Sequence, residues 1–303
     1  MTQYPVLFSS FTLNGLVIPN RIVMAPMTRS HSPGGHPTQD VADYYRRRAE
    51  GGVGLIITEG TTIDHPSASM DDKIPDFHTP EALAGWKRVA DEVHEVGGLI
   101  MPQLWHTGSM RHEGTGLTPE ARTVSPSGLK YPGKEVGVAL SKQDVSDIAD
   151  AFAKGSVAAR EAGFDGAQFH GAHGYLIDTF FWEGTNIRDD EYGGALEERT
   201  AFAVEIIEKS RAAVGNDFPL IIRLSQWKQQ DFDHKMATDP DKLLAFLKPM
   251  MDAGIDCFDC STRRFWESEF EGSDLNFAGW TKKLTGLPTI TVGSVGLTGE
   301  FVA

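Results

Sequence analysis

Short apolar runs that alternate with helical patterns constrain the fold of this chain more than any other feature. Each run is separated from the next by a helix or a long loop, which is typical of a parallel sheet covered on both faces. We predict buried strands at residues 22–25, 55–58, 99–104, 164–170, 220–224, 255–260 and 289–292. Seven such strands favour an α/β barrel of the TIM (β/α)8 type over an open, doubly wound sheet. A doubly wound dinucleotide-binding sheet would also need G-x-G-x-x-G after the first strand, where residues 26–30 read PMTRS.

The segments between these strands carry helix signals. Thr79 is a good N-cap and Pro80 a favourable first helical residue, and apolar residues then recur on one face. Ser141 is followed three residues later by Asp144, in the manner of a capping box. We predict helices at about 40–50, from 80 to the glycines at 97 and 98, after 141, and near 197–213 and 240–253. Two long loops, the first of them polar, are predicted at about 106–140 and 261–286. Residues 6–21 contain an Asn-Gly turn signal and are predicted to form a small hairpin before the barrel.

Composition excludes several classes of protein. The formal net charge of −14 argues against a nucleic-acid-binding surface, which needs a basic stripe. No apolar run approaches the ~20 residues of a membrane span, and the first residues lack the basic and apolar segments of a signal peptide. The two cysteines exclude a disulfide scaffold. We therefore expect a soluble cytoplasmic protein with no membrane and no nucleic-acid partner.

The carboxyl ends of the predicted strands carry an unusual set of residues. In barrels of this kind the working face lies at those ends. The residues found there are Pro26, Met27, Thr28, Glu59, Gly60, Gln103, His170, His173, Arg223, Gly293 and Ser294. They include no paired catalytic carboxylates and no obvious nucleophile. Imidazole, guanidinium, amide and hydroxyl groups together suit a ligand that is rich in hydrogen-bonding edges.

Arg223 ends the apolar run 219–222. A guanidinium at the rim of an apolar core needs an anion or a carbonyl-rich partner. Two interpretations stay open at this point. Arg223 either forms an ion pair with a carboxylate of a neighbouring loop or places a fixed positive charge against a ligand that gains negative charge during turnover.

His170 and His173 form an H-x-x-H pattern that is followed by Tyr175. Such a pair is often structural, and a zinc site would need further ligands, for which the sequence shows no suitably spaced cluster. Two neutral imidazoles can instead both donate a hydrogen bond to one carbonyl oxygen, and a phenol can donate a proton. Metal binding, carbonyl binding and plain packing of these residues all remain possible from the pattern alone.

Two further features have simpler interpretations. Trp105 follows Gln103 by two residues and is either a pocket wall or part of the core. Cys257 and Cys260 stand three apart in a predicted strand, so their side chains point to opposite faces. We interpret them as two inert core thiols rather than as a reactive pair.

Several segments together match one family. They are residues 20–29 (NRIVMAPMTR), 58–60 (TEG), 103–105 (QLW), 164–176 (FDGAQFHGAHGYL), 186–194 (NIRDDEYGG), Arg223 and residues 291–294 (TVGS). Through these segments the chain resembles the Old Yellow Enzyme family of FMN-dependent ene-reductases. The resemblance extends from about residue 7 to residue 296, and it implies a (β/α)8 barrel with FMN across the carboxyl-terminal mouth.

The resemblance also implies roles for individual residues. The segment Pro26, Met27 and Thr28 would line the flavin, with Thr28 near the C4 carbonyl. Gly60 and Gln103 would meet the pyrimidine edge. Arg223 would face N1 and the C2 carbonyl, where the reduced flavin carries negative charge, and Gly293 and Ser294 would bind phosphate through backbone N–H groups. His170 and His173 would hold the substrate carbonyl beside Trp105, and Tyr175 would donate a proton.

The reaction implied by the resemblance is a two-step, ping-pong reduction. NADH or NADPH reduces the flavin and leaves, and an α,β-unsaturated carbonyl compound then occupies the same place. Hydride goes to Cβ and Tyr175 protonates Cα, while the two imidazoles stabilise the enolate oxygen. The expected partners are small molecules, and the chain is expected to be a monomer or a homo-oligomer.

The chain departs from the family pattern at its end. We expect residues 1–303 to form one FMN-binding barrel domain that lacks the eighth βα unit and therefore half of the usual phosphate site. This departure leaves two alternatives: a flavin-binding barrel without turnover, and the barrel part of an iron–sulfur dienoyl reductase or amine dehydrogenase. A metal-dependent hydrolase that uses His170 and His173 is a third alternative from a different class.

Overall fold

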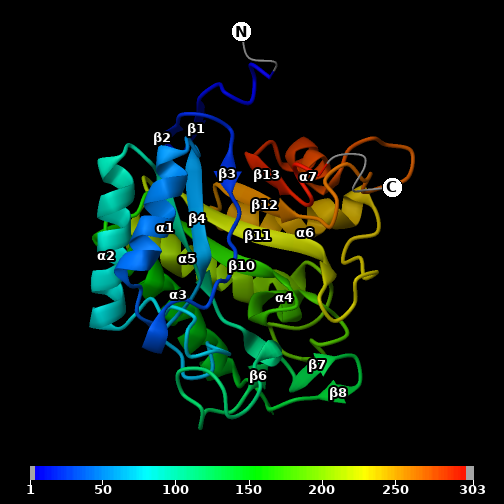
Figure 1. Cartoon of the computed structure of the whole chain (residues 1–303). Helices are drawn as coiled ribbons and strands as arrows, with labels where there is room; N and C mark the ends of the chain where they lie inside the picture. The colour runs from blue at the N-terminus through cyan, green and yellow to red at the C-terminus, as the bar shows by residue number, and fades with distance from the viewer. Residues whose placement is uncertain (1–3, 298–303) are drawn as a thin grey trace.

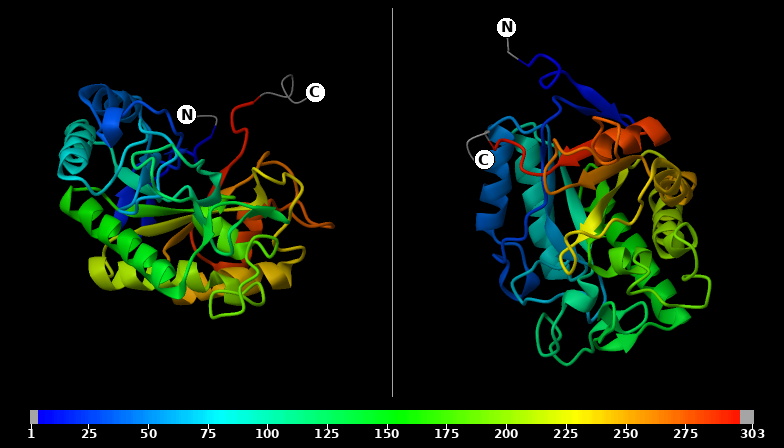
Figure 2. Two further views of the ribbon diagram at one scale, coloured as in Figure 1. Left: turned by 90° about the horizontal axis from the view of Figure 1, so that it is seen from below. Right: turned by 90° about the vertical axis from the view of Figure 1, so that its right-hand side faces the viewer.

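The computed structural model describes residues 4–297 and contains a seven-stranded parallel sheet that curls into a nearly closed barrel (Figures 1 and 2). Its strands are β3 (Val23–Met24), β4 (Leu55–Thr62), β5 (Ile100–Trp105), β10 (Ala167–His173), β11 (Leu220–Lys228), β12 (Cys257–Ser261) and β13 (Thr289–Val292). They lie in this order around the sheet, so consecutive strands are neighbours and β3 and β13 are its edges. All seven predicted strands are confirmed.

Helices lie along the outer surface of the sheet (Figure 2). They are α1 (Gln39–Glu50), α2 (Pro80–Glu95), α3 (Lys142–Glu161), α5 (Ala201–Val214), α6 (Pro240–Asp252) and α7 (Phe277–Thr285). The predicted capping box is present, because the Ser141 hydroxyl accepts from the Asp144 N–H and the Asp144 carboxylate accepts from the Ser141 N–H. Within residues 4–297 no helix is both long and apolar enough to cross a membrane.

Several predicted boundaries are wrong at the carboxyl ends of strands. β4 continues to Thr62, β10 to His173 and β11 to Lys228, so residues expected after the strands lie inside them. The apolar runs end earlier, but the backbone ladder continues through the polar residues of the barrel mouth. Helix α7 lies in a segment predicted to be loop, where Asn276 caps its start and Gly286 adopts a left-handed conformation after its end.

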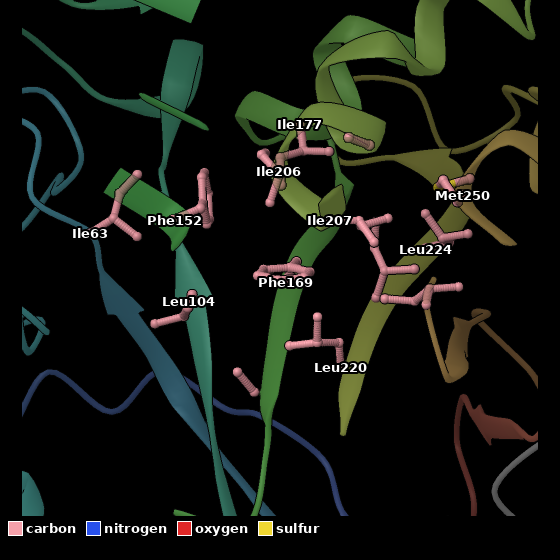
Figure 3. Close-up of a cluster of buried hydrophobic side chains, with 14 of the residues drawn as sticks. Ile63, Leu104, Phe152, Phe169, Ile177, Ile206, Ile207, Leu220, Leu224 and Met250 are labelled. Carbon is pink, nitrogen blue, oxygen red and sulfur yellow. The ribbon is translucent and has the colours of Figure 1, made fainter. Parts of the chain in front are cut away.

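The main hydrophobic core lies between the sheet and the helices (Figure 3). Phe169 of β10 packs against Phe152 of α3, with ring centroids 6.1 Å apart. Because strand side chains alternate between faces, the neighbours of Phe169 in sequence, Gln168 and His170, face the barrel interior. Packing on the outside of the barrel therefore decides which side chains reach the inside.

The interior of the barrel is layered. Near its amino-terminal end lie apolar side chains that pack with the hairpin of β1 (Phe11–Leu13) and β2 (Leu16–Ile18): Leu55, Met101, Ile221 and Cys257. The hairpin turns at Asn14 and Gly15, which both have positive φ, as a two-residue turn of this type requires. Its prediction is confirmed. The hairpin and these side chains cover the end of the barrel opposite the carboxyl ends of the strands.

A buried cation organises the long segment between β5 and α3. This segment was predicted to be a polar loop. It contains one turn of 3-10 helix, η2 (Gly108–Met110), and four short strands: β6 (Val124–Ser125), β7 (Leu129–Tyr131), β8 (Lys134–Glu135) and β9 (Val138–Ala139). Arg111 is fully buried in it. The guanidinium donates to the backbone carbonyls of Ser69, Thr115, Thr118 and Ala121 at 2.7–3.2 Å. Main-chain oxygens therefore satisfy this charge in place of a carboxylate.

Candidate active site

Two histidines come together at the mouth because strand β10 is irregular. Residues three apart in a regular strand point to opposite faces, yet the rings of His170 and His173 lie 5.3 Å apart and nearly perpendicular. The strand register shifts between Gly171 and His173, and His173 adopts a positive φ of 67°. A left-handed conformation in a non-glycine residue is strained and is often found at functional sites. The bulge thus places both imidazoles on one side of the strand.

Aromatic side chains surround this pair. Tyr175 precedes the short helix α4 (Leu176–Phe181), and its ring lies 4.9 Å from that of His170. Trp105 is buried and contacts both the His170 ring, at 5.8 Å, and the Tyr175 ring, at 4.7 Å. Trp227 stacks on His173 at 4.6 Å. Trp105 is therefore both a core residue and a wall of the site.

Burial fixes the protonation states of these groups. Burial, with the positive charge of Arg223 nearby, holds the pKa of both His170 and His173 well below the usual value. Both imidazoles are therefore neutral at pH 7, and each has one N–H group. Burial raises the pKa of Tyr175, against the opposing effect of a hydrogen bond with Gln229, so the phenol keeps its proton. Among the described residues, no group of three or more His, Cys, Asp or Glu side chains is placed to hold a metal ion.

A chain of buried polar side chains crosses the barrel below the histidines. The Gln103 amide donates to Gln168 at 2.7 Å, and the Gln168 amide donates to Asp259 at 3.0 Å. Arg223 donates to the same Asp259 oxygen at 3.0 Å. The ion pair suggested for Arg223 is thus present, but its partner lies on the neighbouring strand β12 rather than on a loop. The Nε of Arg223 has no partner within residues 4–297 and remains available to a ligand.

Gln168, Asp259 and Ser261 also belong to this site, although they were not predicted from the sequence. Asp259 stands between Cys257 and Cys260 in a strand whose sequence pattern indicates two core thiols. The cysteines are indeed buried and belong to separate core clusters, Cys257 inside the barrel and Cys260 toward the helices. A usable signal was present, because polar residues two apart in an apolar strand share one face, as Asp259 and Ser261 do.

Gly60 lies inside β4 beside the indole of Trp105. The substitution Gly60→Ala is expected to destabilise the protein by about 1–3 kcal/mol. A Cβ atom at this position would lie 2.4 Å from Cε3 of Trp105, and that ring is held between neighbours in the site. Urea unfolding measures the loss. Gly51→Ala is the matched control, because Gly51 has an ordinary φ of −73° and room for a methyl group. Equal losses in both variants would contradict this explanation.

The remaining predicted site residues lie around the rim without joining the buried chain. Met27 is two-thirds exposed on the segment after β3, and Pro26 and Thr28 lie on either side of it. The next residue, Arg29, pairs with the buried Glu59 of β4 and so ties this segment to the sheet.

The loop after β13 contains Gly293 and Ser294, both with positive φ. The Gly293 carbonyl accepts from the Phe265 N–H at 2.9 Å, and the Ser294 hydroxyl donates to the Arg263 carbonyl at 3.0 Å. A Cβ on Gly293 would meet the Thr262 carbonyl oxygen at 2.4 Å. Glycine is therefore required here by the close approach of the loop after β12.

Comparison with known proteins extends these observations. A family model described as the NADH:flavin oxidoreductase / NADH oxidase family matches residues 6–298. The chain belongs to this family. An NADH oxidase from Thermoanaerobacter brockii is 35% identical over 97% of the chain and 46% of its own length. The 12-oxophytodienoate reductase 7 of Oryza sativa subsp. japonica is 35% identical over 78% of the chain and 61% of its own length.

Solved structures of family members confirm the barrel and the resemblance to Old Yellow Enzyme. The Old Yellow Enzyme homologue from Zymomonas mobilis has a TM-score of 0.84 and 29% identity, with 98% of this chain and 84% of that one covered. Morphinone reductase in complex with tetrahydroNAD has a TM-score of 0.83 and 29% identity, with 96% and 81% covered. The chain spans less than two thirds of the length of the first curated relatives that it matches, with shares between 46% and 63%.

Proposed function

We propose that this chain is an FMN-dependent oxidoreductase that reduces the C=C bond of α,β-unsaturated carbonyl compounds with NADH or NADPH in a ping-pong cycle. The observation that carries this proposal is the placement of two neutral imidazoles and one protonated phenol at the open end of the barrel. Such a set can hold and polarise a carbonyl oxygen and deliver a proton. Membership of a flavin oxidoreductase family supports the choice of cofactor.

The residues present fit a flavin. Several buried nitrogen atoms near the mouth lack partners within residues 4–297, among them Nε of Arg223, Nε1 of Trp105, Nε1 of Trp227 and Nδ1 of His170. Buried donors without acceptors are rare in native proteins and indicate a ligand or water. We assign Arg223 to the N1 and C2 carbonyl side of FMN and Gln103, with Gly60, to its pyrimidine edge. Pro26, Met27 and Thr28 would line the ring, while Gly293 and Ser294 would bind the phosphate.

The side chains around the ligand have distinct roles in this proposal. FMN, when bound, would supply the chemistry of hydride transfer. His170 and His173 donate hydrogen bonds to the carbonyl oxygen of the substrate, where negative charge grows as the C=C bond is reduced. Because both are held neutral, they donate without adding a full charge. Tyr175 donates its proton to Cα, and its raised pKa keeps that proton on the phenol until it is needed. Trp105 and Trp227 flank the rings and exclude water.

An anaerobic absorbance experiment tests the proposal. The purified protein is expected to show an oxidised flavin spectrum that NADPH or NADH bleaches and that 2-cyclohexenone then restores. Tyr175→Phe is the informative variant, because it should leave bleaching unchanged and slow the return of colour. Bleaching without any return in the wild type would favour the alternative, a flavin-binding barrel without turnover on enones. Absence of flavin after reconstitution with FMN would contradict the proposal as a whole.

A further inference from the structure

One hydroxyl group bridges the two halves of the site. Ser261, at the carboxyl end of β12, is 4% exposed. Its Oγ lies 2.8 Å from Nε2 of His173 and 3.4 Å from Nη2 of Arg223. Ser261 therefore connects the residue assigned to the flavin with one of the residues assigned to the substrate.

The hydrogen-bonding capacities of these groups decide which way each bond runs. A guanidinium has donors and no acceptor, so Arg223 can only donate to the Ser261 oxygen. The Ser261 proton must then go elsewhere. Within residues 4–297 the one acceptor in reach is Nε2 of His173. If Nε2 carried the proton instead, Ser261 would accept twice and its own buried O–H group would have no acceptor, which is unfavourable.

We propose that Ser261 holds His173 in the tautomer that carries its proton on Nδ1. The Ser261 O–H group donates to Nε2, and the N–H group at Nδ1 is left as the donor of this ring. The hydrogen bond that the His173 ring makes within residues 4–297 is at Nε2, which leaves Nδ1 to a ligand. Ser261 is a positioning residue in this arrangement, because it acts through His173 and orients the proton without touching the ligand.

Other contacts keep the ring where Ser261 can act on it. The backbone N–H of His173 donates to the Ser225 hydroxyl at 2.9 Å, and that hydroxyl donates to the backbone carbonyl of Trp227 at 2.7 Å. The ring itself stacks on the Trp227 indole with an interplanar angle of 29°. Backbone and ring are therefore fixed from separate directions. The tautomer is then the remaining freedom of this side chain, and it is usually set by the hydrogen bond that the other ring nitrogen makes.

The consequence for ligand binding rests on the proposed function. A carbonyl oxygen needs a donor from each imidazole, and His173 can supply one from Nδ1 only if Nε2 is unprotonated. Loss of the Ser261 hydroxyl releases the ring to protonate Nε2. Nδ1 then becomes an acceptor that repels the substrate oxygen. Phenol, whose oxygen also accepts hydrogen bonds, serves as a non-reacting probe of this effect.

Nitrogen NMR of the flavin-loaded protein, labelled with ¹⁵N at its histidine side chains, tests the tautomer directly. The chemical shift of a protonated ring nitrogen differs clearly from that of an unprotonated one, and the His173→Asn variant assigns the signals. The expected result is a protonated Nδ1 on His173 in the wild type and in Ser261→Thr. In Ser261→Ala the proton is expected to move to Nε2. A wild-type His173 that is protonated on Nε2 would overturn the proposal.

Binding provides the second measurement. Ser261→Ala is expected to weaken phenol binding about tenfold, equivalent to one lost hydrogen bond, while Ser261→Thr retains it. The FMN content of each variant is measured in parallel and should not change. If phenol fails to bind even the wild type, the proposed function fails while the NMR result still decides the tautomer. Unchanged phenol affinity in Ser261→Ala would contradict the proposal.

Discussion

The double substitution His170→Ala and His173→Ala is expected to abolish phenol binding and to lower turnover of 2-cyclohexenone by about 10³-fold or more, while FMN stays bound. Removal of a single donor from an oxyanion-binding site typically costs about 10²–10³ in rate, and this variant removes both. FMN is expected to remain because its assigned contacts, Arg223 and Gln103, belong to the buried polar chain and not to the imidazole pair.

Absorbance titration with phenol and steady-state rates measure these effects. The matched control is His31→Ala with His112→Ala, which removes two exposed imidazoles from elsewhere on the chain. That control should behave as the wild type in both assays. Phenol affinity that survives the loss of His170 and His173 would show that other groups hold the ligand oxygen. Loss of FMN from the variant would show that the imidazoles support the flavin site instead.

The second large effect concerns stability. Lys228→Met is expected to lower the free energy of unfolding by about 3–5 kcal/mol. Lys228 lies at the end of β11 and donates to Asp178 of α4 at 2.7 Å, and neither side chain is exposed to solvent. The other Asp178 oxygen accepts from the Gly174 N–H at 2.6 Å, directly between His173 and Tyr175. Removing the ammonium leaves a buried carboxylate without its counter-charge.

Urea unfolding of the variant measures this loss. Lys248→Met is the control, because the pair of Lys248 and Asp252 has a similar distance of 2.6 Å but is more than 60% exposed on both sides. An exposed pair contributes about 0–1 kcal/mol. The combined change of Lys228→Met with Asp178→Leu should recover much of the loss, because it removes the unpaired charge. A loss confined to about 1 kcal/mol in Lys228→Met would mean that water reaches Asp178.

The fold could be predicted from local patterns wherever one pattern dominated a segment. The strand at 220–224 follows from the apolar run 219–222, and the helix after Ser141 begins with a capping box, so both were predicted from sequence. Helix α7 was missed because it has nine residues and only three of them, Phe277, Ala278 and Thr281, are buried. Its ends are set by Asn276 and Gly286, which are also common in loops. Short elements of this kind depend on tertiary packing more than on their own sequence.

The site was predictable only in part. The motif around His170, His173 and Tyr175 left several roles open, and only the family resemblance implied carbonyl binding; the structure brings these three side chains together. The bulge that makes this possible could not be read from the pattern, since a regular strand would have separated the imidazoles. The pairing of Asp259 with Arg223 was missed because the two residues are 36 positions apart, and nothing local indicates such a pairing. Contacts between strands depend on register, which sequence patterns specify weakly.

The burial of Arg111 has a consequence for how this chain can change over time. Its guanidinium is held by carbonyl oxygens of the main chain, and every residue type can supply a carbonyl. The residues at 115, 118 and 121 can therefore be exchanged without altering what they offer to the cation. In this set of hydrogen bonds, only position 111 requires a particular side chain, the guanidinium of Arg111. Around that position, the surface beside the barrel mouth is free to diversify toward new ligands while its backbone path is preserved.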